Sequence, residues 1–152
     1  MENKLQASLG LCLLGLIENE RFARRELAAV YRDRLSGLPG VMTMPQPPNV
    51  ILSDQYFVIL VAENEAGVSR DVLWDALKQF KVFTRRYFTP LCSEYPHFKW
   101  LPSANPAGLP VAHNVAREVL CLPFCGALGI DDAHRICDIV EHILGSPPIE
   151  RA

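Results

Sequence analysis

The sequence lacks an excess of charge of either sign. Fifteen basic and 17 acidic side chains leave a net charge of −2 at neutral pH. No basic field therefore favours nucleic acid, and no acidic tail indicates disorder. A glycine-rich phosphate loop and an alternation of basic with aromatic residues are also missing. We therefore expect no nucleic-acid partner.

A long hydrophobic run is missing too. The most apolar stretch, Leu5–Ile17, is shorter than the roughly 20 apolar residues that cross a bilayer. It has no basic flank and no small-residue cleavage site like those of a signal peptide, and Glu18 follows it directly. The five cysteines show no disulfide framework. These absences predict a cytoplasmic protein that does not contact a membrane.

The chain begins with a stretch of helical pattern, residues 5–35, whose two halves differ in the distribution of apolar side chains. The apolar side chains of its first half surround the helix axis, so this half needs cover on every side. They are Leu9, Leu11, Cys12, Leu13, Leu14, Leu16 and Ile17. The second half is rich in charge and keeps its apolar residues on one face. We predict a single long helix that ends near Ser36. Its N-terminal half is expected to be buried, and its C-terminal half is expected to be exposed to solvent on one face.

The rest of the chain, of ordinary globular composition, predicts a small sheet. Apolar runs rich in strand-forming residues predict strands at Tyr56–Ala62, Val82–Phe88 and Val119–Leu122. The prolines of Met42–Pro48 predict an extended connector there. The long stretch Cys92–Pro110 is loop-like, and loops of this length are often functional.

Three further helices are expected around this sheet. Ser69 is placed to cap the first, Pro110 is placed to begin the second over Val111–Glu118, and Asp131 is placed to cap the last. The predicted fold class is α+β, with a long N-terminal helix followed by about three strands and helices packed on them. We expect an interdomain-type helix at 1–36, a small domain at 37–146 and a loose tail at 147–152.

Seven phrases of the sequence resemble one enzyme family. NKLQASLGL (residues 3–11) and ARRELAAVYRDRLSGLPGV (23–41) are similar to the stretch that joins the two domains of the DegT/StrS family. Later phrases agree in order: QYFVIL, GVSRDVLWDALK, TRRYFTPL, LPVAHNVAREVLCLP and LGIDDAHRICDIVEHI. Members of this family are pyridoxal-phosphate-dependent aminotransferases of nucleotide-linked keto sugars. The phrase RRYF.PL is similar to the branch that aminates dTDP-linked keto-6-deoxy sugars.

The resemblance also implies that something is absent. In the family, the lysine that forms a Schiff base with pyridoxal phosphate belongs to a large domain upstream of the similar region. The four lysines of this chain, Lys4, Lys78, Lys81 and Lys99, lie in no phrase like the cofactor-lysine motif. We therefore expect no catalytic residue, no cofactor-binding residue and no cofactor in this chain alone.

Three residues are candidates for substrate contact by the same resemblance. Tyr87 stands where many relatives have a histidine that lines the sugar pocket, and Arg85 and Arg86 are candidates for the phosphates of the nucleotide. The alternative is structural: an arginine pair on a strand edge is often salt-bridged, and Tyr87 could close the core with its hydroxyl outward. Cys121 and Cys125 do not have zinc-knuckle spacing, so no metal site is expected.

Two functions remain open at this point. In the first, the chain is the C-terminal part of a sugar aminotransferase, not catalytic alone, with the missing large domain as its partner. In the second, it is a free-standing, non-catalytic interaction module that self-associates through its apolar helix. Leu9, Leu13, Leu16 and Ile17 would form that contact.

Overall fold

The computed structural model describes residues 4–145 of the chain. The main elements are α1 (Lys4–Leu14), α2 (Ile17–Leu35), β1 (Val41–Thr43), β2 (Phe57–Val61), α3 (Glu63–Ala66), α4 (Arg70–Gln79), α5 (Pro110–Glu118), β3 (Val119–Leu122) and α6 (Ile130–Gly145). Three short 3₁₀ turns lie between α4 and α5. This composition confirms the predicted α+β class, and the tail expected at 147–152 lies outside the described residues.

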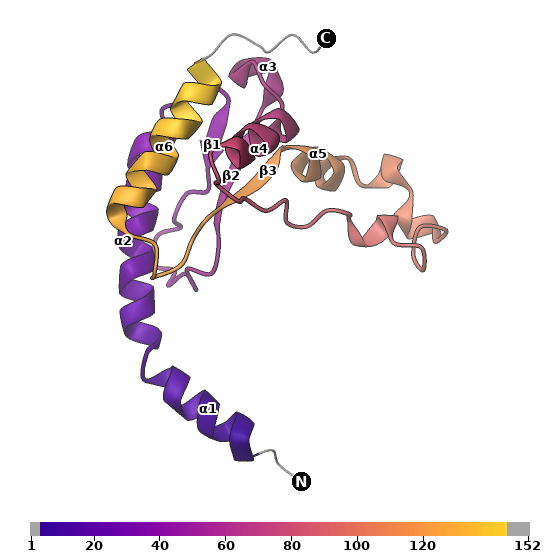
Figure 1. Ribbon diagram of the computed structural model, residues 1–152. Coiled ribbons are helices and arrows are strands. Elements are labelled where there is room, and N and C mark those ends of the chain that lie inside the picture. The colour runs from indigo at the N-terminus through magenta and orange to yellow at the C-terminus, as the bar shows by residue number, and fades with distance from the viewer. Residues whose placement is uncertain (1–3, 146–152) are drawn as a thin grey trace.

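The three strands form one antiparallel sheet in the order β1-β2-β3 (Figure 1). Val41 pairs with Val61 at one side of β2, and Phe57 pairs with Leu122 at the other. The side chains of β2 alternate, with Phe57, Ile59 and Val61 buried and those between them half-buried. This period of two turns one face of the sheet towards the core.

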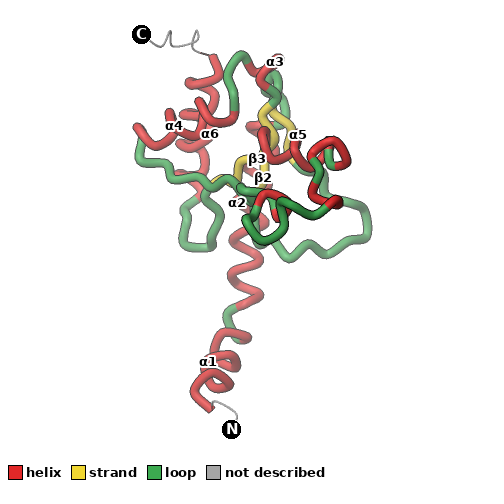
Figure 2. Tube along the Cα trace, turned by 90° about the vertical axis from the view of Figure 1, so that its right-hand side faces the viewer, coloured by secondary structure: helices red, strands yellow, loops and turns green. Residues whose placement is uncertain are grey.

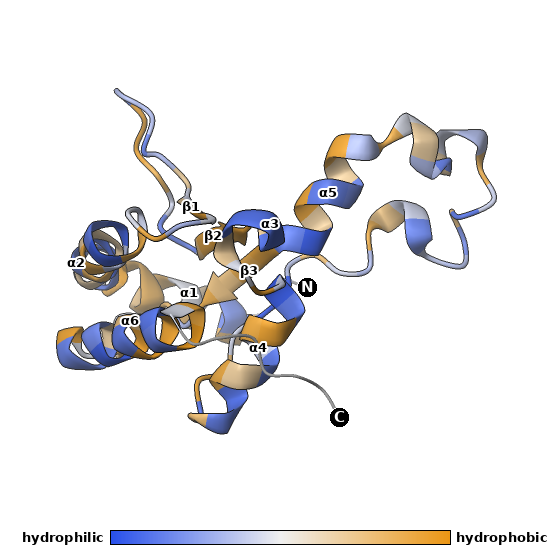
Figure 3. Cartoon of the chain, turned by 90° about the horizontal axis from the view of Figure 1, so that it is seen from above, coloured by the Kyte–Doolittle hydropathy of each residue, from blue (hydrophilic) through white to orange (hydrophobic). Residues whose placement is uncertain are grey.

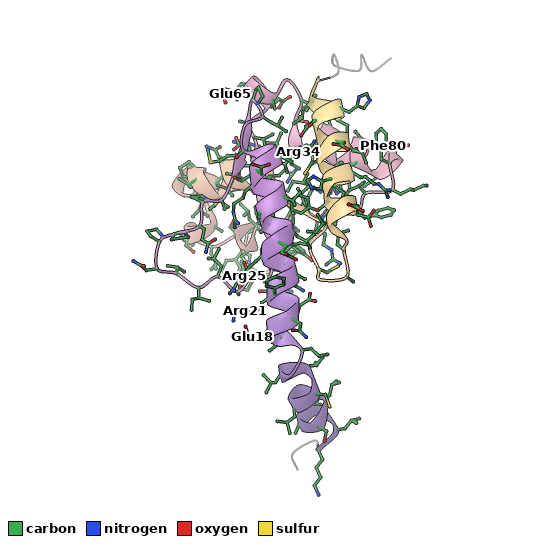
Figure 4. The ribbon with its side chains drawn as sticks, turned by 90° about the vertical axis from the view of Figure 1, so that its left-hand side faces the viewer. Glu18, Arg21, Arg25, Arg34, Glu65 and Phe80 are labelled. Carbon is green, nitrogen blue, oxygen red and sulfur yellow. The ribbon has the colours of Figure 1, made fainter. Side chains whose placement is uncertain are left out.

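Helices α2, α4 and α6 cover that face and supply most of the remaining core. Viewed from above, α4 and α6 lie on one side of the strands, and α5 with the loop that precedes it lies on the other (Figure 3). Tyr31 of α2 is fully buried, and its hydroxyl donates to the carbonyl oxygen of Pro123 at 2.9 Å. Arg34 reaches from α2 to Asp138 and Glu141 of α6 at 2.7 and 2.8 Å (Figure 4).

The prediction of one unbroken N-terminal helix is wrong. The helix breaks at Gly15 and Leu16, so that α1 and α2 are separate, and α1 extends away from the rest of the molecule (Figure 2). At the break, the amide of Leu16 donates to the carbonyl of Leu13, a tighter 3₁₀-type bond. Gly15 weakens the helix at this point, because glycine inside a helix costs about 1 kcal/mol relative to alanine.

The leading apolar segment, residues 5–17, lies outside the core. Its seven leucine and isoleucine side chains are between 42% and 77% exposed, and α1 has no buried residue. Residues 4–145 therefore do not supply the cover that this segment was expected to need. Within the same residues, no helix is both long enough and apolar enough to cross a membrane.

Two of the three predicted strands are confirmed, as β2 and β3, and the predicted strand at Val82–Phe88 does not form. Instead of a strand at Val82–Phe88, the chain makes a single antiparallel bridge between Arg85 and Cys121. The side chains alternate as they do in a strand, since Val82 and Thr84 are buried and Phe83 is exposed, but the backbone meets β3 at only one residue. The free edge of β2 is taken by β1, which ends before the prolines of the predicted connector begin.

The predicted helix starts are close to those observed. The hydroxyl of Ser69 accepts from the amide of Val72 at 3.3 Å and caps α4, and Pro110 is the first residue of α5. Helix α6 begins at Ile130, so Asp131 lies in its first turn and does not cap it. A carboxylate in the first turn still favours the helix dipole.

Candidate functional site

The segment that carries the predicted substrate-contact residues is fixed to the sheet by its backbone. The amide of Arg85 donates to the carbonyl of Cys121 at 3.0 Å, and the amide of Cys121 donates back to Arg85 at 2.7 Å. Tyr87 follows in a turn, in which the amide of Thr89 donates to the carbonyl of Arg86 at 3.0 Å. The bridge thus fixes the backbone at Arg85, two residues before Tyr87.

Tyr87 lies in a small aromatic cluster. Its ring centroid is 4.9 Å from that of Phe88, in a stacked arrangement, and 5.2 Å from that of Tyr56, which meets it edge-on. Its hydroxyl accepts a hydrogen bond from Nη1 of the exposed Arg85. This contact raises the pKa of the Arg85 guanidinium, which therefore stays charged. A phenol and a guanidinium are thus presented together at the surface.

Arg86 has a different environment. Its Nη1 lies 3.1 Å from Oδ1 of Asp71, and its guanidinium lies 4.0 Å above the ring of Trp74. Partial burial alone would raise the pKa of Asp71, but hydrogen bonds and charge from Arg86 and Arg70 outweigh it and lower that pKa. The structure therefore gives Arg86 protein partners, and of the two arginines Arg85 is the freer to meet a ligand.

The partners of Arg86 belong to a cluster that sequence reasoning missed. Arg70 is only 5% exposed; its Nη1 donates to the carbonyl of Val119 at 2.6 Å and its Nε to Asp71 at 2.8 Å. Nε1 of Trp74 donates to the carbonyl of Thr84 at 3.2 Å. These contacts tie the start of α4 to the segment before Tyr87. An arginine and an aspartate beside the Ser69 cap were the signal, but their partners are distant in sequence.

An apolar groove of about 740 Å³ adjoins Tyr87. Its walls come from the segment 87–92, from α5 and from the residues just before α5; among them are Tyr87, Phe88, Leu91, Leu109, Val111 and Val115. A groove of this size with a hydroxyl at its rim resembles ordinary small-molecule sites. Arg85 is not among the residues that line this groove, and it reaches the groove only through its hydrogen bond to the hydroxyl of Tyr87.

Metal ligation has no comparable support. Among residues 4–145, no three histidine, cysteine, aspartate or glutamate side chains gather closely enough to hold a metal ion. Cys121 is buried, and that burial raises the pKa of its thiol. Nδ1 of His113 instead lies 3.7 Å from Oε1 of Glu94.

Comparison with known proteins gives a consistent result. The model of the DegT/DnrJ/EryC1/StrS aminotransferase family matches residues 1–141. Over 121 residues the chain is 36% identical to dTDP-4-amino-4,6-dideoxy-D-glucose transaminase of Escherichia coli, covering 80% of this chain and 32% of that enzyme.

Two solved structures are similar over nearly the whole chain. DesI, crystallised in the presence of its TDP-sugar product, is 32% identical with a TM-score of 0.82, over 91% of this chain and 34% of its own. DesV of S. venezuelae, in complex with a ketimine intermediate, is 25% identical with a TM-score of 0.83, over 94% of this chain and 37% of its own. The chain thus spans about a third of the length of the proteins it matches.

Proposed function

Because this chain belongs to the DegT/DnrJ/EryC1/StrS aminotransferase family, we propose that it forms the small domain of a pyridoxal-phosphate-dependent sugar aminotransferase. The substrate class is a nucleotide-linked keto-deoxy sugar, with dTDP as the nucleotide, and the compartment is the cytoplasm. The names of the relatives support the sugar and the nucleotide, since a dTDP-sugar transaminase and a protein with a TDP-sugar product are among them.

We propose that the described residues do not form a pyridoxal-phosphate site on their own. That cofactor supplies an electron sink for amino-group transfer, and it needs a lysine amine, a carboxylate at the ring nitrogen and donors for its phosphate. Lys78 is paired with Asp75 at 3.1 Å, and Lys4, Lys81 and Lys99 are exposed. None of the four lysines lines the groove beside Tyr87. We therefore assign no catalytic or cofactor-binding residue within 4–145 and propose that the large-domain part of the assembly holds the cofactor.

Tyr87 and Arg85 are the proposed substrate contacts of this domain. The hydroxyl of Tyr87 would meet a hydroxyl of the sugar, and the exposed Arg85 guanidinium would meet a phosphate of the nucleotide, to which planar guanidinium groups bind well. Arg86 could contact the substrate only if its guanidinium gave up its contacts with Asp71 and Trp74, so we propose it as a weaker candidate than Arg85.

The observation that carries this proposal is the exposure of the leading apolar segment. Fully burying one leucine or isoleucine contributes about 1.5–3 kcal/mol. Seven such side chains stand in solvent on residues 5–17. We propose that a large domain covers them, as the family membership implies.

A chimaera tests the proposal. In it, this chain replaces the matching segment of the E. coli relative, and transamination of a dTDP-linked keto sugar is measured. We expect activity, and we expect Arg85→Gln to raise the KM for the nucleotide sugar about tenfold, with Arg135→Gln on α6 as the control. A folded chimaera that binds pyridoxal phosphate but does not turn over would contradict the proposal.

The same exposed segment favours a second candidate, a non-catalytic module that self-associates. Leu9, Leu13, Leu16 and Ile17 would form the contact between copies. Sedimentation of the isolated chain distinguishes the two ideas when combined with the chimaera. A tight dimer that Leu9→Glu and Leu13→Glu dissolve, together with an inactive chimaera, would favour the module.

A further inference from the structure

A second groove lies between α2 and the segment that joins β1 to β2. That segment loops out beyond the strands (Figure 3) and leaves a recess of about 420 Å³ against the helix. Met44, Pro45, Leu52 and Phe124 supply apolar walls, and Arg32 of α2 supplies a cation. This groove shares no lining residue with the groove beside Tyr87.

Arg32 differs from every other arginine of α2. Arg21 pairs with Glu18, Arg24 with Glu20, Arg25 with Asp54, and Arg34 with Asp138 and Glu141. Arg32 makes no ion pair or hydrogen bond with any residue that the structure describes. Its Nε is buried without a partner, as is Nε of Arg21, but Arg21 keeps an ion pair through Nη1 and Arg32 has none. Its guanidinium lies 5.7 Å from the ring centroid of Phe57.

Burying Nε of Arg32 without an acceptor is costly. A buried donor that finds no acceptor loses its hydration, at roughly 1–3 kcal/mol, and a charged group loses more. A carboxylate would remove this cost, because its two oxygens match the fork of the guanidinium. The site is thus complementary to a negative charge that residues 4–145 do not provide.

The one carboxylate that lines the groove does not meet this need. Asp54 points to Arg25, with Nε of Arg25 3.3 Å from Oδ2, and its side chain is only 8% exposed. The backbone around it is held as well, since Nη1 of Arg24 donates to the carbonyl oxygen of Asp54 at 3.0 Å. The charge of Asp54 is offset in place, and Arg32 remains the unmatched charge among the described residues of the groove.

We propose that this groove binds a small organic carboxylate with an apolar body. The carboxylate meets Arg32, and the hydrocarbon or aromatic body lies against Met44, Pro45, Leu52 and Phe124. A recess of 420 Å³ is within the range of small-molecule sites. The apolar walls favour this class over inorganic phosphate, which has no body for them to cover. The proposal does not depend on the aminotransferase function.

The test is an NMR titration of the full chain with 3-phenylpropionate and, separately, with its neutral amide. The acid and the amide have the same shape, so their difference measures the charge alone. We expect the acid to shift amide signals of residues 28–32, 44–58 and 124, and to bind about tenfold or more tightly than the amide. Equal affinities, or shifts that gather elsewhere, would overturn the proposal.

Two variants sharpen the result. Arg32→Gln is expected to weaken binding of 3-phenylpropionate to that of the amide, while Arg135→Gln, which removes an exposed arginine on α6, is expected to leave it unchanged. Unchanged binding by Arg32→Gln would also overturn the proposal. If that variant does not fold, the comparison of acid with amide on the natural chain still decides.

Discussion

Oε1 of Glu20 accepts a hydrogen bond of 2.8 Å from the backbone amide of Gly126. Glu20 stands in the first turn of α2, and Gly126 lies in the loop between β3 and α6. The same oxygen is 2.7 Å from Nε of Arg24. The carboxylate of Glu20 therefore joins the start of α2 to the loop between β3 and α6.

This carboxylate makes stability depend on pH in the acid range. The hydrogen bond from Gly126 and the neighbouring Arg24 lower the pKa of Glu20. The stabilisation is therefore fully present above the unfolded-state pKa, about 4.3, and is lost as the pH falls through the lowered pKa of the folded state. Urea unfolding between about pH 6 and pH 3 should show a weaker loss of stability for Glu20→Gln than for the natural chain.

Glu65→Gln is the matched control for that experiment. It removes one negative charge from an exposed position on α3 (Figure 4). If Glu20→Gln and Glu65→Gln change the pH profile equally, the contact between Glu20 and Gly126 contributes nothing specific.

Local signals predicted the helices well and the sheet partly. Ser69 and Pro110 mark helix starts because a capping hydroxyl and a missing amide act on the neighbouring turn. The prediction of a strand at Val82–Phe88 failed because a run of strand-forming residues does not say which backbone segments pair with one another. The break at Gly15 was missed because the leucines on either side dominated the pattern.

The site shows the same division. Arg85 and Tyr87 are only two residues apart, so the sequence already places their side chains near one another. The contacts of Tyr87 with Tyr56, and of Arg86 with Asp71 and Trp74, join residues that only the tertiary fold brings together. No local pattern carries that information.

Arg70 is predicted to be the most sensitive charged residue of the domain. Arg70→Met removes the donor to the carbonyl of Val119 and leaves Asp71 with one partner fewer. We expect a loss of about 2–3 kcal/mol in the free energy of unfolding in urea. Arg135→Met breaks a pair with Asp132 in which the arginine is 75% exposed, and it should cost less than about 0.5 kcal/mol. Equal losses in the free energy of unfolding would show that the contacts of Arg70 stabilise the domain no more than an exposed ion pair does.

Gly40 and Gly67 have similar backbone conformations but different surroundings, so replacing each with alanine distinguishes the cost of steric crowding from the cost of backbone strain. Gly40 and Gly67 have φ of 68° and 73°. A Cβ at Gly40 would lie 2.3 Å from the amide nitrogen of Ala66, whereas a Cβ at Gly67 would meet nothing within 4 Å. We expect Gly67→Ala to cost about 1 kcal/mol and Gly40→Ala to cost at least about 2 kcal/mol, measured by thermal unfolding. A Gly67→Ala variant as unstable as Gly40→Ala would contradict this close approach.

Hydrogen exchange of residues 5–17 tests the central claim most directly. The claim is that this segment is shaped to lie against a large aminotransferase domain. Amide exchange followed by mass spectrometry is predicted to be fast in the isolated chain, at a concentration where it sediments as a monomer, and strongly slowed in the chimaera. Exchange that is equally fast in a folded, cofactor-loaded chimaera, or already slow in the monomer, would contradict it.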